Sequence, residues 1–209
     1  ILTRQDKILM NSRIKVLQEQ KRHAQEKEIK TLELSSDSAI CREDVEFLSA
    51  IGKEIYELLE NIYITQAPIL KNREELISYS SSLYADSPEL QEHLYKILKD
   101  RDNLADTYIK PFQALLLHGR SPKLTRSCFG YARLEPPIYE KGRIIRGAIV
   151  SLIPSGPASE VAAPVTSEVI GTLLEEPALL KALQSLNKES FTKQLEEILL
   201  RFYKSTVQT

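Results

Sequence analysis

The sequence contains very little cysteine, since Cys41 and Cys128 are the only two in 209 residues. Neither belongs to a CxxC pair or lies near a histidine in the sequence, so the chain is not organised by a disulfide framework. We therefore expect a reducing compartment, such as the cytoplasm. The chain begins with Ile1 rather than methionine, which leaves open a targeting segment upstream.

Long apolar runs and a strong net charge are also missing. No run approaches the roughly 18 apolar residues that a membrane-spanning helix needs, and the first residues lack the pattern of a signal peptide. We expect no transmembrane segment. The net charge is -1 and the isoelectric point is about 6.4. The chain as a whole therefore has no electrostatic attraction to nucleic acid or anionic membranes, and any such binding needs a local patch.

Known catalytic motifs are absent as well. The sequence has no GxxxxGK[ST], GxGxxG, HExxH or GxSxG string, and no cluster of histidines, cysteines and acids at metal-binding spacing. The SxxK match at residues 185–188 lacks its companion motifs. We expect no catalytic residue, no metal and no cofactor, hence a protein that is not an enzyme. An enzyme with a helical site of a new kind is the least favoured alternative.

Glycine and proline are scarce before residue 119, because six of the seven glycines and seven of the ten prolines lie in residues 119–177. Apolar residues at spacings of three and four predict a helix from residue 40 to about 62. A less regular helix is expected over residues 69–84. Ser87 and Pro88 are a good N-terminal signal for the next helix.

We expect that helix to run to His118, with a kink at Lys110 and Pro111. His118 and Gly119 then resemble its C-terminal end. A histidine at this position has a simple structural interpretation, because its partly charged side chain interacts favourably with the helix dipole. His23 and His93 are similarly isolated in the sequence.

Short runs rich in β-branched and aromatic residues at 128–134 and 143–153 could pair as a small hairpin. A passage like a linker is expected over residues 154–164, followed by further helices. The predicted fold is mainly α: a multi-helix bundle with a protruding N-terminal helix and a proline- and glycine-rich insertion. The predicted units are a helical arm at residues 1–35 and a helical domain at residues 36–209, with the irregular insertion at 119–165.

The N-terminal arm is rich in helix-forming residues and contains no proline or glycine up to residue 30. A candidate assembly seam follows a sevenfold spacing at Leu2, Leu9 and Val16, which is typical of a coiled coil. The apolar seam stops halfway along the helix. The alternatives are a solvated arm, a partial coiled coil with another chain, and packing against the domain itself.

Residues 119–147 form a basic segment with interleaved aromatic residues. Cations beside flat rings are typical of surfaces that bind single-stranded nucleic acid. A solvated loop, a surface for an anionic protein and a surface for nucleic acid or acidic lipid remain as alternatives. The candidate partner- or anion-binding residues are Arg120, Lys123, Arg126, Arg133, Lys141, Arg143 and Arg146.

These observations favour a non-enzymatic helical module for protein–protein interaction, such as an adaptor, a scaffold subunit or an effector-type domain. Its expected partner is another protein or a second copy of itself, which would make an oligomer. The alternative is binding of nucleic acid or acidic phospholipid through the basic segment 120–146.

Overall fold

The structure is a computed structural model that describes residues 37–207, with side chains described for residues 46–206. The predicted arm at residues 1–35 and its seam at Leu2, Leu9 and Val16 lie outside the described residues. No helix among the described residues is long and apolar enough to cross a membrane.

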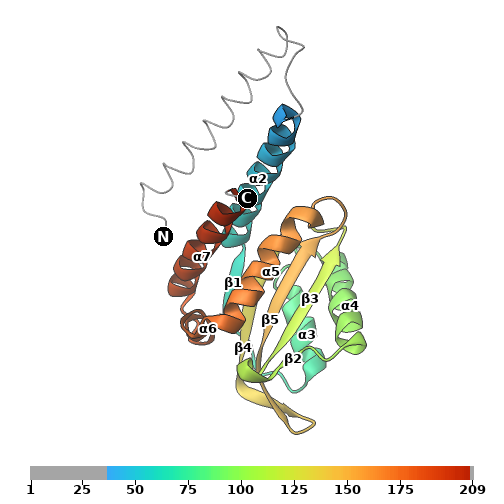
Figure 1. The fold of residues 1–209 in the computed structure, drawn as a ribbon. Coiled ribbons are helices and arrows are strands. Elements are labelled where there is room, and N and C mark those ends of the chain that lie inside the picture. The colour runs from blue at the N-terminus through green and yellow to red at the C-terminus, as the bar shows by residue number, and fades with distance from the viewer. Residues whose placement is uncertain (1–36, 208–209) are drawn as a thin grey trace.

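The described chain alternates between helices and strands (Figure 1). Its elements, in chain order, are α2 (Asp37–Glu60), β1 (Ile62–Gln66), α3 (Arg73–Ser82), α4 (Pro88–Leu104), β2 (Tyr108–Ile109), the 3-10 turn η1 (Lys110–Phe112), β3 (Ala114–Ser121), β4 (Cys128–Glu140), β5 (Arg143–Pro154), α5 (Ser159–Glu175), α6 (Pro177–Gln184) and α7 (Lys188–Val207).

The strands form one mixed sheet of five strands in the order β1-β4-β5-β3-β2. β1 is parallel to β4, and β3 is parallel to β5. β4 and β5 form an antiparallel hairpin at the centre of the sheet, and β2 is a short antiparallel edge strand next to β3. A β-bulge interrupts the hairpin between Arg133 and Ile138.

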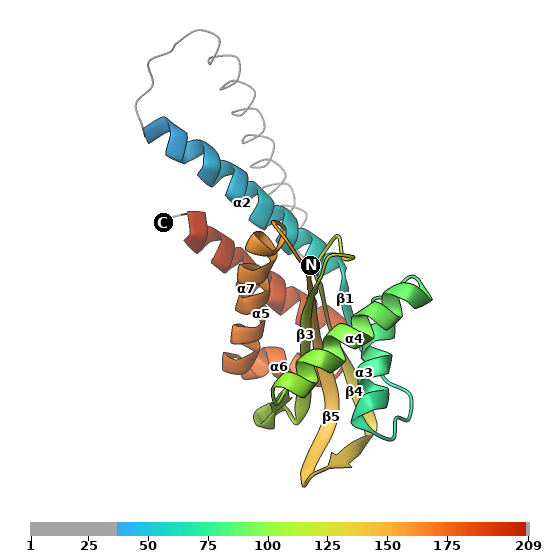
Figure 2. The same cartoon turned by 90° about the vertical axis from the view of Figure 1, so that its right-hand side faces the viewer.

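Helices cover both faces of this sheet (Figure 2). α2, α5, α6 and α7 pack on one face, around residues such as Phe129 and Phe191, whose rings stack with centroids 5.9 Å apart. α3 and α4 pack on the other face, around Leu76, Leu94 and Leu117. The sheet therefore lies between two separate apolar cores, which is the arrangement of an α/β fold.

The prediction of a mainly α bundle is wrong. The segment 119–165, predicted as an irregular insertion, contains β5, the central strand of the sheet, and its neighbour β4. The runs 128–134 and 143–153 do pair with each other, but within longer strands. The expected linker at 154–164 is also wrong, because α5 begins at Ser159 and includes Pro164.

The segment that ends at His118 differs most from expectation. α4 does begin at Pro88, and the side chain of its N-cap Ser87 accepts a hydrogen bond from the Leu90 backbone N–H at 3.2 Å. It ends at Leu104, however, well before His118. Residues 114–117 are an unbroken apolar run that lies between the two cores as part of β3, and a short apolar run is ambiguous between helix and strand.

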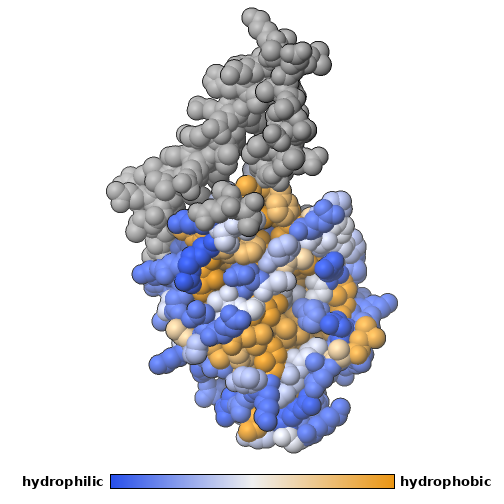
Figure 3. Space-filling model, in the orientation of Figure 1, coloured by the Kyte–Doolittle hydropathy of each residue, from blue (hydrophilic) through white to orange (hydrophobic). Residues whose placement is uncertain are grey.

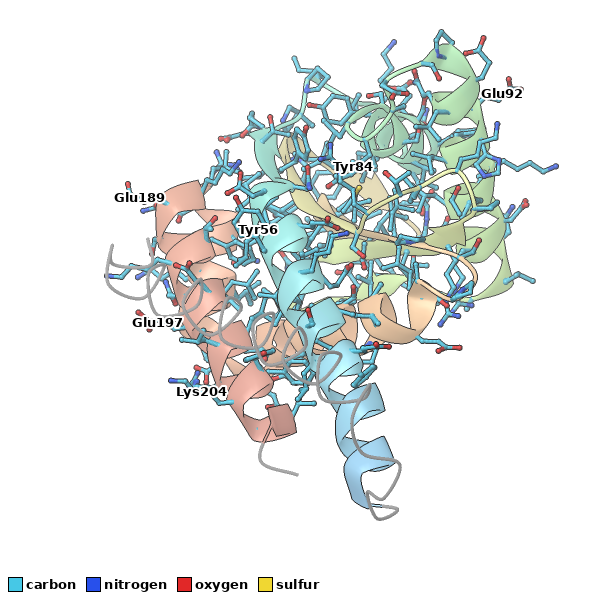
Figure 4. All side chains as sticks on the ribbon, turned by 90° about the horizontal axis from the view of Figure 1, so that it is seen from above. Tyr56, Tyr84, Glu92, Glu189, Glu197 and Lys204 are labelled. Carbon is cyan, nitrogen blue, oxygen red and sulfur yellow. The ribbon has the colours of Figure 1, made fainter. Side chains whose placement is uncertain are left out.

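Tyr84, which follows α3, extends into the interior of the domain (Figure 4). Its ring meets that of Tyr63 edge to face, with centroids 5.4 Å apart. Its hydroxyl oxygen is buried and has no hydrogen-bond partner among the described residues. Burial raises the pKa of this hydroxyl well above its usual value. The hydroxyl therefore has a desolvation cost that no contact in the described domain offsets.

Replacing Tyr84 by Phe should stabilise the domain by about 1 kcal/mol, because the variant keeps the ring and removes the unpaired hydroxyl. Urea unfolding followed by circular dichroism measures the change. The matched control is Tyr56→Phe, since Tyr56 is 52% exposed and its hydroxyl can stay hydrated. A loss of stability in Tyr84→Phe would show that the hydroxyl does have a partner.

Candidate functional site

His118 lies on β3, close to the edge of the sheet. β2 pairs with β3 only at Ala114 and Leu115, and the Leu116 backbone N–H donates to the Thr107 carbonyl, so within the described sheet no strand covers the outer edge of β3 beyond Leu116. On the inner side, His118 pairs with Ser151 of β5. Side chains alternate along a strand, so Leu117 joins the core under α4 while His118 belongs to the opposite face. The imidazole is partly exposed.

Both ring nitrogens of His118 have a neighbour. The guanidinium Nε of Arg101, from α4, donates a hydrogen bond to Nε2 at 2.9 Å. Nδ1 lies 3.2 Å from the backbone oxygen of Leu116. A guanidinium can only donate, so Nε2 must be the acceptor, and a carbonyl can only accept, so Nδ1 carries the proton. The geometry therefore selects a neutral imidazole whose lone pair is on Nε2, where it accepts the hydrogen bond from Arg101.

One side of α4 lies directly along β3, and from there the Arg101 side chain reaches past the strand to the His118 ring on the other face. His93, Ile97 and Arg101 are spaced four residues apart, so they share one face of the helix. His93 contacts Ser121 and Arg101 contacts His118. Between them, a Cβ on Gly119 would collide with Cγ2 of Ile97. The absence of a side chain at residue 119 therefore allows α4 to approach β3 closely.

The end of α4 is also held from the other side. Arg73 of α3 donates two hydrogen bonds to Asp102, with Nε 2.8 Å from Oδ2, and a third to the Thr107 hydroxyl at 2.9 Å. It also pairs with Glu140 of β4 at 3.3 Å. The Arg73 and Asp102 side chains are only 18% and 7% exposed. This buried network fixes the residue next to Arg101 in the chain.

His93, the other described histidine, has a different environment. Its Nε2 lies 3.0 Å from Oγ of Ser121. Ser121 is fully buried, and its Oγ also accepts the backbone N–H of Lys123 at 3.1 Å. This arrangement joins α4 to the turn after β3. His93 therefore has a structural contact with a neutral hydroxyl, whereas the lone pair of His118 accepts a hydrogen bond from a cation.

Cys128 is a weak candidate for a nucleophile. The cysteine is free and buried, and burial raises the pKa of its thiol to about 11. A thiol needs to ionise before it attacks, so Cys128 stays protonated and unreactive at neutral pH.

The pair His118 and Arg101 has a defined chemical capacity. A neutral imidazole nitrogen is a nucleophile, and an adjacent guanidinium favours an incoming group that carries negative charge. Figure 3 shows apolar residues gathered in the middle of the domain on the side where α5 lies, with polar residues around them. Separately, the partial exposure of His118 leaves its ring accessible from outside the domain, as a reaction with another protein requires.

The seven predicted basic residues do not form one patch. Arg120, Lys123 and Arg126 are exposed at the end of β3 and in the turn after it. At the other end of the sheet, Arg143 pairs with Asp106 at 2.7 Å and lies over the ring of Tyr108, while Lys141 is exposed in the hairpin turn. Arg133 and Arg146, from the neighbouring strands β4 and β5, both line one groove.

The aromatic residues of the basic segment do not form a stacking surface. Phe129 and Tyr131 are buried in the core, at 0% and 2% exposure, and only Tyr139 is exposed. Bases cannot stack on rings that are already packed. Sequence reasoning also missed the pair His118 and Arg101, because it placed both residues on one helix.

Comparison with known proteins identifies the fold family. Residues 57–198, about two thirds of the chain, match the family described as phosphoenolpyruvate-dependent sugar phosphotransferase system, EIIA 2. No curated protein matches the chain at a significant level.

Two solved structures resemble the chain. The first is the nitrogen regulatory protein IIA-Ntr from Neisseria meningitidis, with 17% identity, a TM-score of 0.49, and coverage of 68% of this chain and 94% of that one. The second is the protein assigned as PTS IIA (PtxA) from Streptococcus mutans, with 14% identity, a TM-score of 0.45, and coverage of 72% and 96%. At these TM-scores neither carries the assignment, which rests on the family match.

The match corrects the functional interpretation of the sequence. The prediction of a helical adaptor, scaffold or effector-type module is wrong, and so are the predicted helical bundle and coiled coil on which it depended. The alternative prediction, binding of nucleic acid or phospholipid, is wrong as well. The expected class of partner, another protein, agrees with a multi-component phosphotransferase system. The chain belongs to the family of the phosphoenolpyruvate-dependent sugar phosphotransferase system, EIIA 2.

Proposed function

We propose that this chain is a phosphoryl carrier in which Nε2 of His118 accepts and passes on a phosphoryl group. The observation that carries the proposal is the pair of contacts on the imidazole: Arg101 Nε at 2.9 Å from Nε2, and the Leu116 oxygen at 3.2 Å from Nδ1. Together they place the lone pair of a neutral imidazole on Nε2, directly beside the positive charge of Arg101. Family membership supplies the class of reaction.

In the proposed step, the lone pair of Nε2 attacks the phosphorus of a phosphorylated donor protein. A P–N bond forms as the bond between phosphorus and the donor breaks, and the donor keeps that electron pair. The proton on Nδ1 stays on the ring, where the Leu116 oxygen accepts it as a hydrogen bond. That contact stabilises the positive charge that develops on the imidazole. Passing the group to an acceptor reverses these events.

Arg101 has two roles in this scheme. Before transfer, its hydrogen bond holds the ring in the tautomer with an unprotonated Nε2. During transfer, the guanidinium releases Nε2 and donates to the oxygens of the phosphoryl group, whose negative charge it offsets. Arg101 is exposed, so its side chain has room for this change. Arg120, exposed and two residues beyond His118 on β3, supplies a second positive charge on the same face.

The donor and acceptor are proposed to be other protein components of the same phosphotransferase system. The cytoplasmic compartment expected from the low cysteine content agrees with this role. The chain is itself phosphorylated and dephosphorylated in the scheme, and no turnover of a small molecule is proposed for it.

Replacing His118 by Asn should abolish phosphorylation by a phosphorylated donor protein of the system, because the amide keeps the polarity of the site and has no nucleophilic nitrogen. Intact-protein mass spectrometry at neutral pH measures uptake of one phosphoryl group. The matched control is His93→Asn, which should still be phosphorylated. Retained uptake in His118→Asn, or its loss only in His93→Asn, would refute the assignment of His118.

Replacing Gly119 by Ala should slow phosphoryl uptake and cost about 2 kcal/mol of stability, because the new methyl group forces α4 away from β3 and separates Arg101 from His118. Adding Ile97→Ala removes the colliding methyl group and should restore much of the uptake rate. Rapid-quench phosphorylation and urea unfolding measure the two effects. A folded Gly119→Ala protein with an unchanged rate would contradict the role given to this contact.

A further inference from the structure

An open groove of about 560 Å³ lies near the start of β3, where η1, β4, β5 and the end of α6 meet. It is separate from the histidine site. β3 rises by about 3.3 Å per residue, so His118 lies about 13 Å along the strand from Ala114. The residues of the groove that carry the argument are Gln113, Tyr131, Arg133, Glu135, Arg146 and Gln184.

Arg133, on one side of the groove, has its hydrogen-bonding groups largely occupied. Its Nη2 pairs with Oε2 of Glu135 at 2.6 Å, and its Nε donates to Oε1 of Gln66 at 3.0 Å. Its Nη1 lies 3.5 Å from the backbone oxygen of Gln184. The charge of Arg133 is therefore balanced by Glu135. Arg133 lines the groove but has little capacity left to bind a ligand.

Arg146, on the other side, is held in place but not neutralised. Its Nε donates to Oε1 of Gln113 at 2.6 Å, and its backbone N–H donates to the Gln113 carbonyl, also at 2.6 Å. Gln113 itself has a left-handed backbone, with φ at 50°. Within the described part of the chain, Nη1 and Nη2 of Arg146 have no hydrogen-bond or ion-pair partner. The groove thus has one positive charge that nothing balances.

Tyr131 supplies a neutral donor beside these arginines. Its ring is buried, and a Cβ on Gly147 would lie 2.8 Å from its hydroxyl oxygen, so the glycine next to Arg146 makes room for the hydroxyl. Burial raises the pKa of Tyr131 to about 12, although the charges of Arg133 and Arg146 both lower it. The hydroxyl therefore keeps its proton at neutral pH and can donate it.

Among the described residues that line the groove, Oε1 of Glu135 and Oε1 of Gln184 are acceptors without a partner. The donors without a partner among them are the Nη atoms of Arg146, the amide nitrogen of Gln113 and the hydroxyl of Tyr131. A ligand that meets these donors has to accept hydrogen bonds and carry negative charge. The donors come from three segments of the chain: β4, β5 and the residue before β3. A tetrahedral phosphate can meet such donors with three oxygens, whereas a carboxylate has two oxygens in one plane.

We propose that this groove binds the phosphate group of a small organic phosphomonoester, with Arg146 as the main anchor. The groove is much larger than a phosphate ion and has the volume of a small-molecule site. Glu135 and Gln184 line the remaining space and can bind hydroxyl groups of the ester. This site does not depend on phosphorylation of His118, and two of its residues, Arg133 and Arg146, belong to the basic set that the sequence singled out.

The test is a titration of the full chain with glucose 6-phosphate, followed by isothermal calorimetry and by the amide NMR signals of Gln113, Tyr131 and Arg146. We expect saturable binding that shifts these signals. Arg146→Gln should weaken binding about 10-fold or more, since it removes a charge-assisted pair. The matched control is Arg126→Gln, which makes the same change of charge at an exposed residue in the turn after β3 and should leave binding unchanged.

Two further probes decide the class of ligand. Inorganic phosphate should bind more weakly than the ester, because it cannot use the rest of the groove, and malate should bind more weakly still. Equal affinity for inorganic phosphate would overturn the assignment of an ester, and equal affinity for malate would overturn the assignment of a phosphate. No saturable binding of any probe, or an equal loss in both variants, would overturn the site itself.

Discussion

Helix α4 can lie directly along β3 because residue 119 has no side chain. With a methyl group there, Ile97 would collide with the strand, and the two elements would have to separate. On one side of this contact His93 meets Ser121, and on the other Arg101 meets His118. The network around Arg73 then fixes Asp102, the residue after Arg101. The geometry of the histidine site therefore depends on a packing contact that belongs to neither of its two residues.

The site itself combines two requirements that normally conflict. A nucleophilic imidazole has to be neutral, and a developing negative charge on a phosphoryl group has to meet a cation. A guanidinium hydrogen-bonded to Nε2 meets both, because it cannot accept a proton and so favours the neutral tautomer while its charge stays in place. The edge position of β3 keeps the ring partly exposed, which a carrier needs if two different proteins are to reach the same nitrogen.

Local signals in the sequence predicted some elements well. Ser87 and Pro88 located the start of α4, and the apolar stripe located α2. The pairing of 128–134 with 143–153 also followed from composition. β1 and β3 were missed for physical reasons. β1 extends the apolar pattern of α2 after a single residue, and residues 114–117 are apolar throughout, so β3 does not show the alternation of a strand with one exposed face.

The candidate site could not be predicted for a related reason. His118 follows an apolar run, and on a helix it would have been a terminal cation of no special interest. Its significance comes from Arg101, seventeen residues earlier, and that contact exists only after α4 and β3 are separate elements packed together. The basic residues were a visible signal, but their sequence proximity was misleading, because β4 and β5 carry them to opposite ends of the sheet.

The central claim is that Nε2 of His118 carries the phosphoryl group while Nδ1 keeps its proton. The most direct measurement is a long-range proton–nitrogen NMR spectrum of the histidine rings before and after phosphorylation, with phosphorus–nitrogen coupling to identify the modified atom. The account predicts a neutral His118 with the proton on Nδ1 in the free chain and phosphorus coupled to Nε2 afterwards. Phosphorus coupled to Nδ1, or to either nitrogen of His93, would contradict it.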